Sequence, residues 1–489
     1  MASNVLFVVF DTARADSFEP YGARVGATPA IAALAASGAA HRSVYASASW
    51  TVPSHASMFS GKLPRSAGFQ HRGPTSDLVY REANRRLAAR DESLPTVLRR
   101  AGFETRGLSG NTWITDNTGF DQGFEEFKLV TRRRPGRLHK KGLKDRLMWR
   151  VDAVKARLDD GASEVGDLLA NWTARRDRRP FFWFVNLIEC HSPFLPPKPF
   201  NPLGPIDRWR SAAEASRYLN VGSIWRCSLG AYDVPDDAIE RMRVLHNASA
   251  SQLDAWVARV LEQLDKHGLL DETQVVLTSD HGENLGDGCL LGHSFSLDDR
   301  LLRVPLVTAG PAALPTDSVM SLTELPAWVC EAAGVHDHPF EAELPKGVAV
   351  AQLDAPGDGD PQRCLDGVQD WNMADGGVAA AAKMGTSIAC AMDGRYKLLR
   401  PHGTGARVAG LPRELLIDTV ADPIETNPQP PTSTQETELA AELKALRAAL
   451  DRAAELERPK TVVSEATKAG RDPSAEAALK EQLAHLGYL

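Results

Sequence analysis

Four short apolar segments, separated by longer stretches with helical periodicity, constrain the fold of this 489-residue chain most strongly. They are rich in Val, Ile, Leu and Phe and lie at residues 5–10, 181–187, 275–279 and 303–308. Strands buried on both faces have this composition, and they alternate with helices in parallel sheets that are covered on both sides. We therefore predict an α/β fold in which helices sandwich a large, mostly parallel or mixed sheet.

Three of the intervening stretches carry clear helix signals. Residues 28–38 and 93–102 each have Pro near the start and Gly at the end, an asymmetry typical of helix termini. Residues 245–268 place apolar side chains three and four positions apart. This spacing predicts a long helix that leads into the strand at 275–279.

The chain is too long for one hydrophobic core, which stops growing at about 250–300 residues. A stretch rich in Gly, Asp and Pro at 354–362 marks a seam. We predict a catalytic α/β domain over residues 1–353 and a small C-terminal domain with an antiparallel sheet over 363–430. Residues 394–399 and 414–417 have the pattern of strands of that small sheet.

The predicted helical tail covers residues 431–489. It opens with a capping box formed by Ser433 and Glu436. Leucines then follow on one helical face, at positions 439, 443, 446 and 450. We expect this stripe to pack against the catalytic domain rather than to bind a cofactor.

Composition argues against several classes of protein. The formal net charge of −7 does not favour nucleic acid as a partner. Six cysteines without a Cys-x-x-Cys pair exclude a zinc ribbon or a dithiol redox motif. No uncharged apolar run approaches the roughly 18 residues of a membrane-spanning helix, and the N-terminus lacks the pattern of a secretory signal. We expect a cytoplasmic protein with no membrane partner, and the sequence leaves a homo-oligomer open.

Two of the predicted strands are followed by acidic residues. Asp11 comes directly after residues 5–10, and Asp280, with His281 beside it, directly after 275–279. The carboxyl ends of parallel strands are where ligand sites form in α/β sheets. We therefore expect these side chains to meet at one edge of the sheet.

A hydroxyl joins this set at Thr51. Pro53 tolerates only the first turn of a helix, so Thr51 stands just before a helix that runs through residues 56–59, beside unsatisfied backbone N–H groups. Two carboxylates, an imidazole and this hydroxyl form a mixed ligand set, which suits Mn²⁺ or Zn²⁺ better than an all-oxygen Ca²⁺ cage. The pattern predicts a hydroxyl nucleophile activated by a divalent cation.

At these residues the sequence resembles the sulfatase branch of the alkaline phosphatase superfamily. The matching blocks follow the family's order over most of positions 4–335, and they lie at residues 4–22, 28–38, 50–61, 187–197, 269–286 and 303–311. The resemblance implies an alkaline phosphatase-like fold and a hydrolase that acts on phosphoric or sulfuric ester bonds.

The departures from the family pattern narrow the chemistry. Most sulfatases have a Cys or Ser that becomes formylglycine where this chain has Thr51, and threonine cannot form that aldehyde. Thr12 replaces a second aspartate, and His281 replaces an asparagine. These changes point away from Ca²⁺, although Ca²⁺ and Mg²⁺ stay open. They resemble the metal-site pattern of phosphonate monoester hydrolases and related phosphodiesterases.

Further polar residues match substrate-side positions of the family. His191 corresponds to a histidine that contacts the transferred group or the leaving oxygen, and His293 replaces a lysine. An imidazole can release a proton near neutral pH, so we predict His293 as the general acid and His191 as a second donor. His55 would contact Thr51 or the substrate anion, with a packed or helix-surface histidine as the alternative.

For each of three further positions, the sequence leaves two interpretations open. Asn111 lies where the family directs a polar group toward the substrate, but it would also suit a turn. Glu283 and Asn284 would either orient His281 or lie at the surface.

The first functional hypothesis is a metal-dependent hydrolase of phosphate mono- or diesters or of phosphonate monoesters. It would act on a small anionic ester through a covalent intermediate on Thr51. The alternatives are a sulfate-ester hydrolase or group transferase without formylglycine, and an inactive relative that binds anions. The sequence leaves open the organic group of the substrate and whether one or two ions bind.

Overall fold

The computed structural model describes residues 3–457 except 70–75, 131–142, 157–158, 229, 231, 294, 315–317 and 356–384. The strands are β1 (Asn4–Phe10), β2 (Ala39–His41), β3 (Val44–Tyr45), β4 (Glu104–Ser109), β5 (Glu126–Leu129), β6 (Phe181–Leu187), β7 (Thr273–Thr278), β8 (Asn284–Leu285), β9 (Leu291–Gly292), β10 (Leu306–Ala309), β11 (Met320–Ser321), β12 (Ala349–Leu353), β13 (Ser387–Met392), β14 (Tyr396–His402) and β15 (Leu415–Asp418). The helices are α1 (Pro29–Ser37), α2 (Thr51–Ser60), α3 (Pro64–Ala67), α4 (Ser76–Ala89), α5 (Leu94–Arg100), α6 (Leu143–Lys155), α7 (Ala162–Arg175), α8 (Pro205–Tyr218), α9 (Val221–Ser228), α10 (Asp236–Lys266), α11 (Asp299–Leu302), α12 (Leu325–Ala332), α15 (Gly403–Val408), α16 (Ser433–Glu438) and α17 (Ala440–Glu455).

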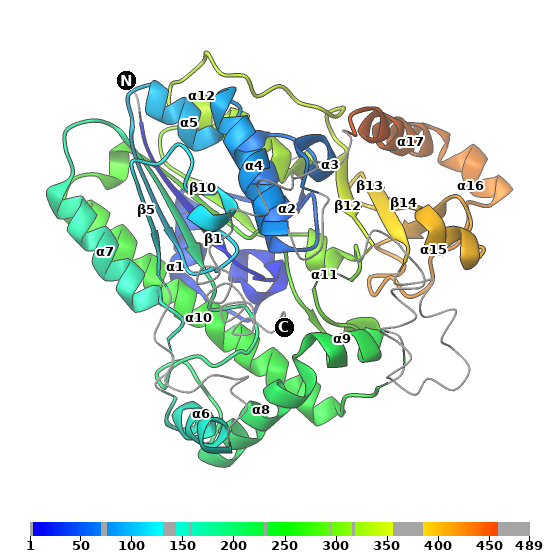
Figure 1. Cartoon of the computed structure of the whole chain (residues 1–489), viewed down its shortest axis with the longest axis horizontal. Coiled ribbons are helices and arrows are strands. Elements are labelled where there is room, and N and C mark those ends of the chain that lie inside the picture. The colour runs from blue at the N-terminus through cyan, green and yellow to red at the C-terminus, as the bar shows by residue number, and fades with distance from the viewer. Residues whose placement is uncertain are drawn as a thin grey trace.

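A mixed sheet with the strand order β2-β10-β7-β1-β6-β4-β5 forms the centre of the molecule (Figure 1). Strand β1 pairs in parallel with both β6 and β7, and β4 pairs in parallel with β5 and β6. Strand β10 runs antiparallel to its neighbours β7 and β2. The predicted α/β fold with a large, mostly parallel or mixed sheet is confirmed.

Strand β1 shows why this sheet is covered on both faces. Its odd-numbered residues, such as Phe7, enter a core that also contains buried residues of α2, α4, α5 and α12. Its even-numbered residues, such as Val8, enter a second core with residues of α1, α7 and α10. Because side chains alternate along a strand, an uninterrupted apolar run serves both cores.

The predicted elements lie close to the observed ones. The four apolar segments correspond to β1, β6, β7 and β10, and residues 28–38 and 93–102 correspond to α1 and α5. The helix predicted at 245–268 begins earlier, since α10 starts at Asp236. Two acidic residues, Asp236 and Asp237, lie in its first turn, where negative charge stabilises a helix.

A second sheet, with the antiparallel order β12-β13-β14-β15, forms the small C-terminal unit. The predicted boundary at residue 353 requires correction, because residues 349–353 form β12 and pair with β13. The Gly/Asp/Pro-rich composition marked the connection but not the strand before it.

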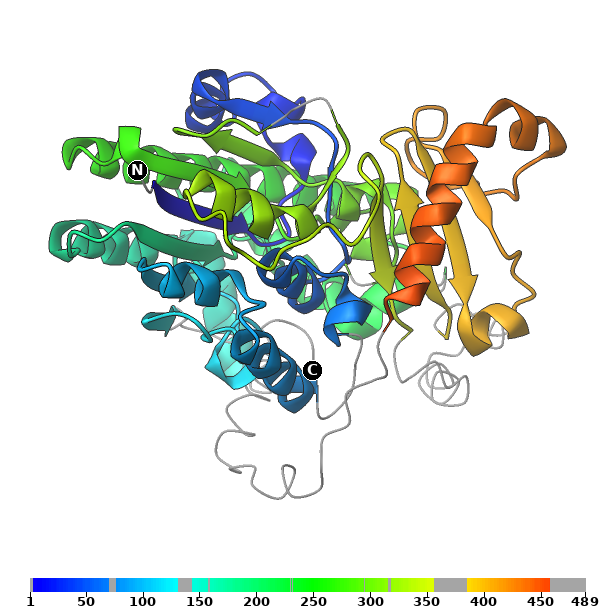
Figure 2. The same ribbon diagram turned by 90° about the horizontal axis from the view of Figure 1, so that it is seen from above.

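The tail also differs from its prediction. Helix α17 packs on the small sheet, where Leu443, Leu446 and Leu450 share a core with residues of β12, β13, β14 and β15 (Figure 2). Leu63, which immediately precedes α3, belongs to the same core. The predicted packing against the catalytic domain is therefore mainly packing against the small sheet. Residues 458–489 of the predicted tail lie outside the described residues.

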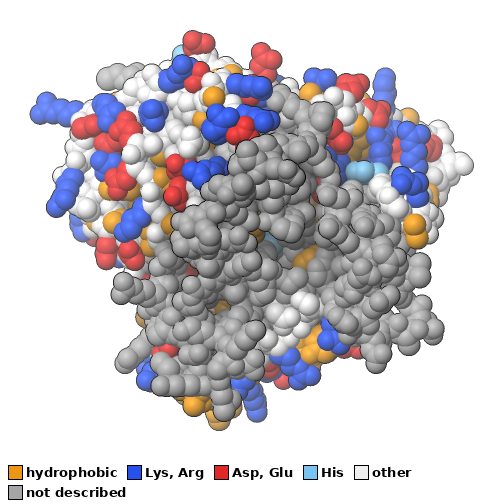
Figure 3. All heavy atoms as spheres, in the orientation of Figure 1, with side chains coloured by type: hydrophobic (Ala, Val, Ile, Leu, Met, Phe, Trp, Pro, Cys, Tyr) orange, Lys and Arg blue, Asp and Glu red, His pale blue; other side chains and the backbone are white. Residues whose placement is uncertain are grey.

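The described surface carries charges of both signs. On the coloured parts of the face in Figure 3, Lys and Arg side chains intermingle with Asp and Glu side chains. Of the helices that the structure describes, none combines the length and the apolar composition that a membrane-spanning segment requires.

Candidate metal and nucleophile site

The site lies at the carboxyl ends of four adjacent strands, in the order β7, β1, β6 and β4. Asp11 follows β1, and Asp280 follows β7 after one intervening residue. The two loops are joined directly, because the backbone N–H of Thr12 donates to Oδ1 of Asp280 at 3.1 Å. The parallel pairing of β1 with β7 thus brings together residues that are far apart in sequence.

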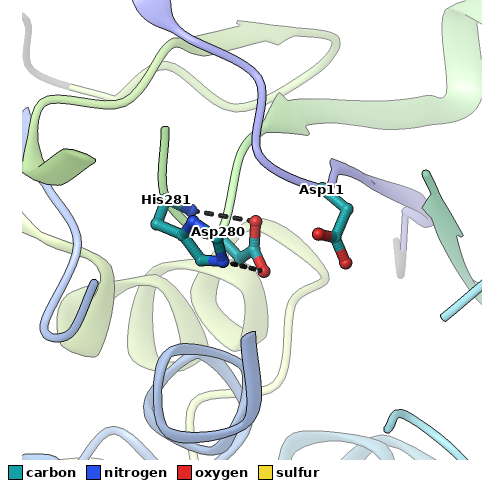
Figure 4. A group of neighbouring side chains, drawn as sticks. All are labelled: Asp11, Asp280 and His281. Carbon is teal, nitrogen blue, oxygen red and sulfur yellow. Dashed lines mark hydrogen bonds and ion pairs between the residues drawn. The ribbon is translucent and has the colours of Figure 1, made fainter. Parts of the chain in front are cut away.

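Three side chains form a group that could hold a metal ion. Asp11, Asp280 and His281 each offer one ligand atom, and these atoms all lie within 4.8 Å of one another. Figure 4 shows the two carboxyl groups and the imidazole ring side by side. Nε2 of His281 lies 3.3 Å from Oδ2 of Asp280, and all three residues are fully buried.

The electrostatics of this group fit a cation. Oδ1 of Asp11 and Oδ2 of Asp280 are buried and have no hydrogen-bond partner among the described residues. Burial raises the pKa of Asp11 to about 6, and repulsion from Asp280 adds to this effect. Burial likewise raises the pKa of Asp280 to about 7. A buried carboxylate oxygen without a partner is costly, and a divalent cation between these two oxygens would remove that cost.

Backbone contacts fix the imidazole of His281. Its Nδ1 donates to the carbonyl oxygen of Gly282 at 2.9 Å, so the neutral ring presents the lone pair of Nε2 toward Asp280. Burial, with repulsion from His293, lowers the pKa of His281 to about 3. A neutral imidazole with its other nitrogen held by a carbonyl oxygen is the usual state of a metal-ligating histidine.

Thr51 is the first residue of α2, so the helix begins one residue earlier than predicted. Its Oγ1 lies 3.4 Å from Nε2 of His281, which brings the hydroxyl to the predicted metal group. Pro53 follows within the first turn, where its missing N–H costs no hydrogen bond. One turn into the helix, Oγ of Ser54 donates to the carbonyl oxygen of Asp280 at 2.6 Å and ties α2 to the end of β7.

His55 lies behind Thr51, inside the core. Its Nδ1 donates to the carbonyl oxygen of Thr51 at 2.9 Å and lies 3.4 Å from Oδ2 of Asp280. Its ring contacts Phe120 and Phe184 edge to face, and burial lowers its pKa to about 3. These contacts fit the packed helix histidine and the predicted contact with Thr51, whereas a contact with substrate stays a prediction.

Two carboxamides hold the carboxylate of Asp11. Nδ2 of Asn111 donates to Oδ2 of Asp11 at 2.6 Å, and Oδ1 of Asn111 accepts from the backbone N–H of Trp113 at 2.8 Å. Nδ2 of Asn186, in β6, donates to the same carboxylate oxygen at 3.4 Å. Asn111 therefore orients a predicted metal ligand, and its role toward substrate stays a prediction.

The two predicted proton donors lie beside the metal group. The ring of His293 is centred 4.7 Å from that of His281 and 5.1 Å from that of His191. Nδ1 of His191 donates to the carbonyl oxygen of Ser192 at 2.8 Å. The structure thus brings both histidines to the site with Asp11, Thr51, Asp280 and His281.

Glu283 and Asn284 are buried, so neither lies at the surface. Oε1 of Glu283 contacts Nδ1 of His293 at 3.1 Å. Nδ2 of Asn284 donates to Ser296 and Asp298, at 3.2 and 3.1 Å. These two side chains thus contact His293 and the residues that follow it, and they do not orient His281.

Two further residues that support the site, Asn186 and Ser279, were not among the predicted site residues. Oγ of Ser279 donates to the carbonyl oxygen of His281 at 2.6 Å and accepts from the backbone N–H of Ala13 at 3.1 Å. A signal existed for Asn186, which is a polar residue within the otherwise apolar run 181–187. Ser279 has no comparable signal, because a serine after a strand is common in loops.

The region that is similar to known proteins includes the residues of this site. The sulfatase family profile matches residues 3–335. Choline-sulfatase from Rhizobium meliloti is 26% identical over 64% of this chain and 63% of its own length. The multifunctional alkaline phosphatase superfamily protein PehA from Trinickia caryophylli is 30% identical over 27% of this chain and 29% of its own. The chain thus spans less than two thirds of these relatives.

Among solved structures, the phosphonate monoester hydrolase from Silicibacter pomeroyi has the same fold, with a TM-score of 0.63. It is 20% identical and the match covers 95% of this chain and 98% of that protein. The family profile covers most of the described residues that precede the small sheet, including both loops that carry the candidate metal group. This chain belongs to the sulfatase family.

Proposed function

We propose that this chain is a metal-dependent hydrolase of phosphate mono- or diesters or of phosphonate monoesters, with Thr51 as the nucleophile and a small metabolite as the substrate. One observation carries the proposal. Oγ1 of Thr51 lies 3.4 Å from Nε2 of His281, in the group that holds the unpartnered oxygens of Asp11 and Asp280. A hydroxyl beside an apparent cation site is what nucleophilic attack on an ester of this kind requires.

Asp11, Asp280, His281 and Thr51 would hold the cation, which would lower the pKa of the hydroxyl and neutralise the ester oxygens when bound. The mixed oxygen and nitrogen set favours Mn²⁺ or Zn²⁺. No formylglycine is involved, since threonine cannot form that aldehyde.

The remaining steps belong to the side chains and the backbone. Oγ1 of Thr51 attacks the phosphorus atom, and the backbone N–H groups at the start of α2 face the developing negative charge. His293 donates a proton to the leaving oxygen, with His191 as a second donor. Hydrolysis of the phosphothreonine by water completes the turnover.

Sulfate-ester hydrolysis is the second candidate, because choline-sulfatase is among the relatives. Assays of aryl phosphate, phosphodiester, phosphonate and sulfate esters, run in parallel, rank the two candidates. We expect a phosphorus ester to turn over fastest, and faster turnover of sulfate would contradict the phosphoryl proposal. Product analysis with added alcohols would identify transfer to an acceptor other than water.

Two substitutions at one position test the nucleophile. Thr51→Ala should abolish turnover and leave the metal content of the purified protein unchanged, since three other ligands remain. Thr51→Ser keeps the hydroxyl and should retain measurable turnover. Undiminished turnover of the alanine variant would refute the mechanism. Stoichiometric metal in the unmodified protein without turnover of any ester would instead indicate an anion-binding relative.

We also propose that the protein acts in the cytoplasm on a free anionic ester, without nucleic acid or a membrane as a partner. The negative net charge supports the exclusion of nucleic acid. Size-exclusion chromatography with light scattering would determine whether the protein is a homo-oligomer.

A further inference from the structure

Glu283 is a buried carboxylate that the proposed mechanism does not use. The residue is 1% exposed, and its Oε1 lies 3.1 Å from Nδ1 of His293. Its other oxygen, Oε2, is buried and has no hydrogen-bond partner among the described residues. The interaction with His293 is therefore the side-chain contact that the structure gives this carboxylate.

The backbone fixes this contact. Strands β8 and β9 form an antiparallel pair in which Asn284 lies opposite Gly292. Glu283 immediately precedes β8 and His293 immediately follows β9, so the two side chains extend from the same end of the pair. The register of a short antiparallel ladder thus sets the position of the imidazole.

A charged group anchors the ladder to the loop after β1. Nη1 of Arg14 lies 3.4 Å from the carbonyl oxygen of Glu283 and 2.6 Å from Oδ2 of Asp287. Asp287 also pairs with Arg243 of α10 at 3.2 Å. Because Arg14 follows Asp11 by three residues, this network connects the ladder to the loop that carries a predicted metal ligand.

The contact with Glu283 occupies the Nδ1 edge of the His293 ring. The same ring lies beside His281 and His191, so it borders the metal group while its Nδ1 edge is turned to the carboxylate. Nε2 is the other nitrogen of the imidazole, separated from Nδ1 by Cε1, and is the nitrogen through which the ring would donate.

We propose that Glu283 is a positioning residue that holds His293 with Nε2 toward the leaving oxygen, and that this pair adapts the site to esters of unactivated alcohols. The inference rests on the proposed function of Thr51. A carboxylate bound to Nδ1–H selects the ring orientation and stabilises the imidazolium that donates, as in other carboxylate–histidine pairs.

The proton and the electrons balance over the two steps. In the first, Oγ1 of Thr51, as the alkoxide, bonds to phosphorus, and the leaving oxygen departs with the electron pair of its bond and takes the proton of Nε2. In the second, a water oxygen bonds to phosphorus, its proton passes to Nε2, and Oγ1 leaves as the alkoxide. Glu283 keeps the Nδ1–H contact in both steps.

The leaving group of the ester determines whether such a proton donor is needed, and this indicates the substrate class. A nitrophenolate leaves readily as an anion, so a proton donor contributes little to its release. An alkoxide is strongly basic, and its departure requires protonation in the transition state. A carboxylate dedicated to orienting the donor therefore points to an alkyl ester rather than to an activated aryl ester.

The experiment compares 4-nitrophenyl, phenyl and ethyl phosphates as substrates of the metal-loaded protein and of Glu283→Gln. We expect the variant to lose about 100-fold or more in kcat on the ethyl ester, and only a few-fold on the 4-nitrophenyl ester, because general acid catalysis contributes about 10²–10⁴-fold. KM and metal content should change little. Glu104→Gln, a buried glutamate at the opposite end of β4, is the matched control and should behave as the unmodified protein.

Further variants distinguish a failure of the inference about Glu283 from a failure of the proposed function of Thr51. Glu283→Asp keeps a carboxylate and should recover part of the loss, and Glu283→Gln should add little to the defect of His293→Gln. The inference would be overturned if Glu283→Gln lost kcat equally on all three esters, or lost none on any of them. It would also be overturned if His293→Gln held one metal ion fewer per chain than an unmodified protein that holds two. Turnover of the 4-nitrophenyl ester by Thr51→Ala would refute the proposed function itself.

Discussion

At the residue scale, Thr12 shows how this site differs from the family pattern. Its φ of 58° lies in the left-handed region, which is strained for a β-branched side chain. This conformation directs its N–H to Oδ1 of Asp280, while its hydroxyl donates to the carbonyl oxygen of Asp11 at 2.7 Å. Thr12 therefore supplies a backbone donor to a predicted ligand, at the position where the sequence resemblance implies a second aspartate.

Asn111 provides a residue-scale prediction about metal binding. Replacing it with alanine removes the 2.6 Å hydrogen bond that holds Asp11, and loss of a contact to a metal ligand typically lowers affinity about 10–100-fold. Titration of the metal-free protein with Mn²⁺ or Zn²⁺ measures this change. Asn117→Ala, at an exposed position nearby, should bind as the unmodified protein does. Equal affinities for the two variants would show that Asn111 does not support Asp11.

Glu189 provides a prediction about pH. Burial raises its pKa to about 8, and Asp160 and Asp159 add repulsion. A folded-state pKa above the ordinary value of 4.5 gives a stabilising contribution that is full below that value and is lost as pH rises through about 8. The free energy of unfolding should therefore fall with pH by up to about 1.4 kcal/mol per unit more steeply than in Glu189→Gln. Urea titrations of both proteins between about pH 5 and 8 measure the slopes, and identical slopes would contradict the assignment.

The residues of the candidate site that could be predicted from the sequence lie at the end of a predicted strand or the start of a predicted helix. Asp11, Asp280 and His281 follow apolar strands, and Thr51 precedes a proline that marks a helix start, so sequence alone placed them together. The contact between Glu283 and His293 was not predictable, because it depends on the register of two short strands. Asn186 supports Asp11 only because β6 lies beside β1.

At the element scale, the C-terminal helices show that sequence periodicity predicts which face of a helix is buried but not which surface that face packs against. The capping box forms between Thr432 and Gln435, one residue before the predicted pair, since Ser, Thr, Glu and Gln recur there at capping distance. Of the leucine stripe, Leu443, Leu446 and Leu450 are buried as expected, whereas Leu439 is only partly buried. An amphipathic pattern establishes that a face is covered but not which surface covers it, and here the small sheet does so.

Leu446 tests that packing. The side chain is fully buried against the small sheet, and truncation of a buried leucine to alanine typically costs about 2–5 kcal/mol. Leu446→Ala should lower the free energy of unfolding by this amount in urea titrations. Lys444→Ala, on the exposed side of the same helix, should change it little. If both variants changed the free energy of unfolding equally little, α17 would not be packed against the small sheet.

At the scale of the whole molecule, a buried ion cluster joins the two sheets. Nζ of Lys397, in β14, lies 2.6 Å from Oδ1 of Asp299 in α11 and 2.9 Å from Oε2 of Glu425. It also donates to the carbonyl oxygen of Leu297 at 3.0 Å. The α/β class and the existence of a small sheet were predictable from strand patterns. This connection was not, since an isolated lysine within a strand more often faces solvent.

Lys397→Met should destabilise the protein by about 3–5 kcal/mol, because it leaves the buried side chain of Glu425 and the partly buried side chain of Asp299 without their cation while roughly keeping the side-chain volume. Denaturation monitored by circular dichroism measures the effect. Arg395→Ala, which breaks an exposed ion pair in the same hairpin, should have little effect. Unchanged stability of the methionine variant would show that the cluster does not hold the two units together.

The proposed mechanism forms a covalent bond between phosphorus and Oγ1 of Thr51, and trapping the protein during turnover would detect this bond. The metal-loaded protein would be mixed with an activated aryl phosphate, quenched in acid within the first turnovers and digested for mass spectrometry. We expect a peptide carrying one phosphoryl group on Thr51, which appears with substrate and disappears when substrate is exhausted. Turnover without any phosphorylated Thr51, or with the phosphoryl group on another residue, would contradict it.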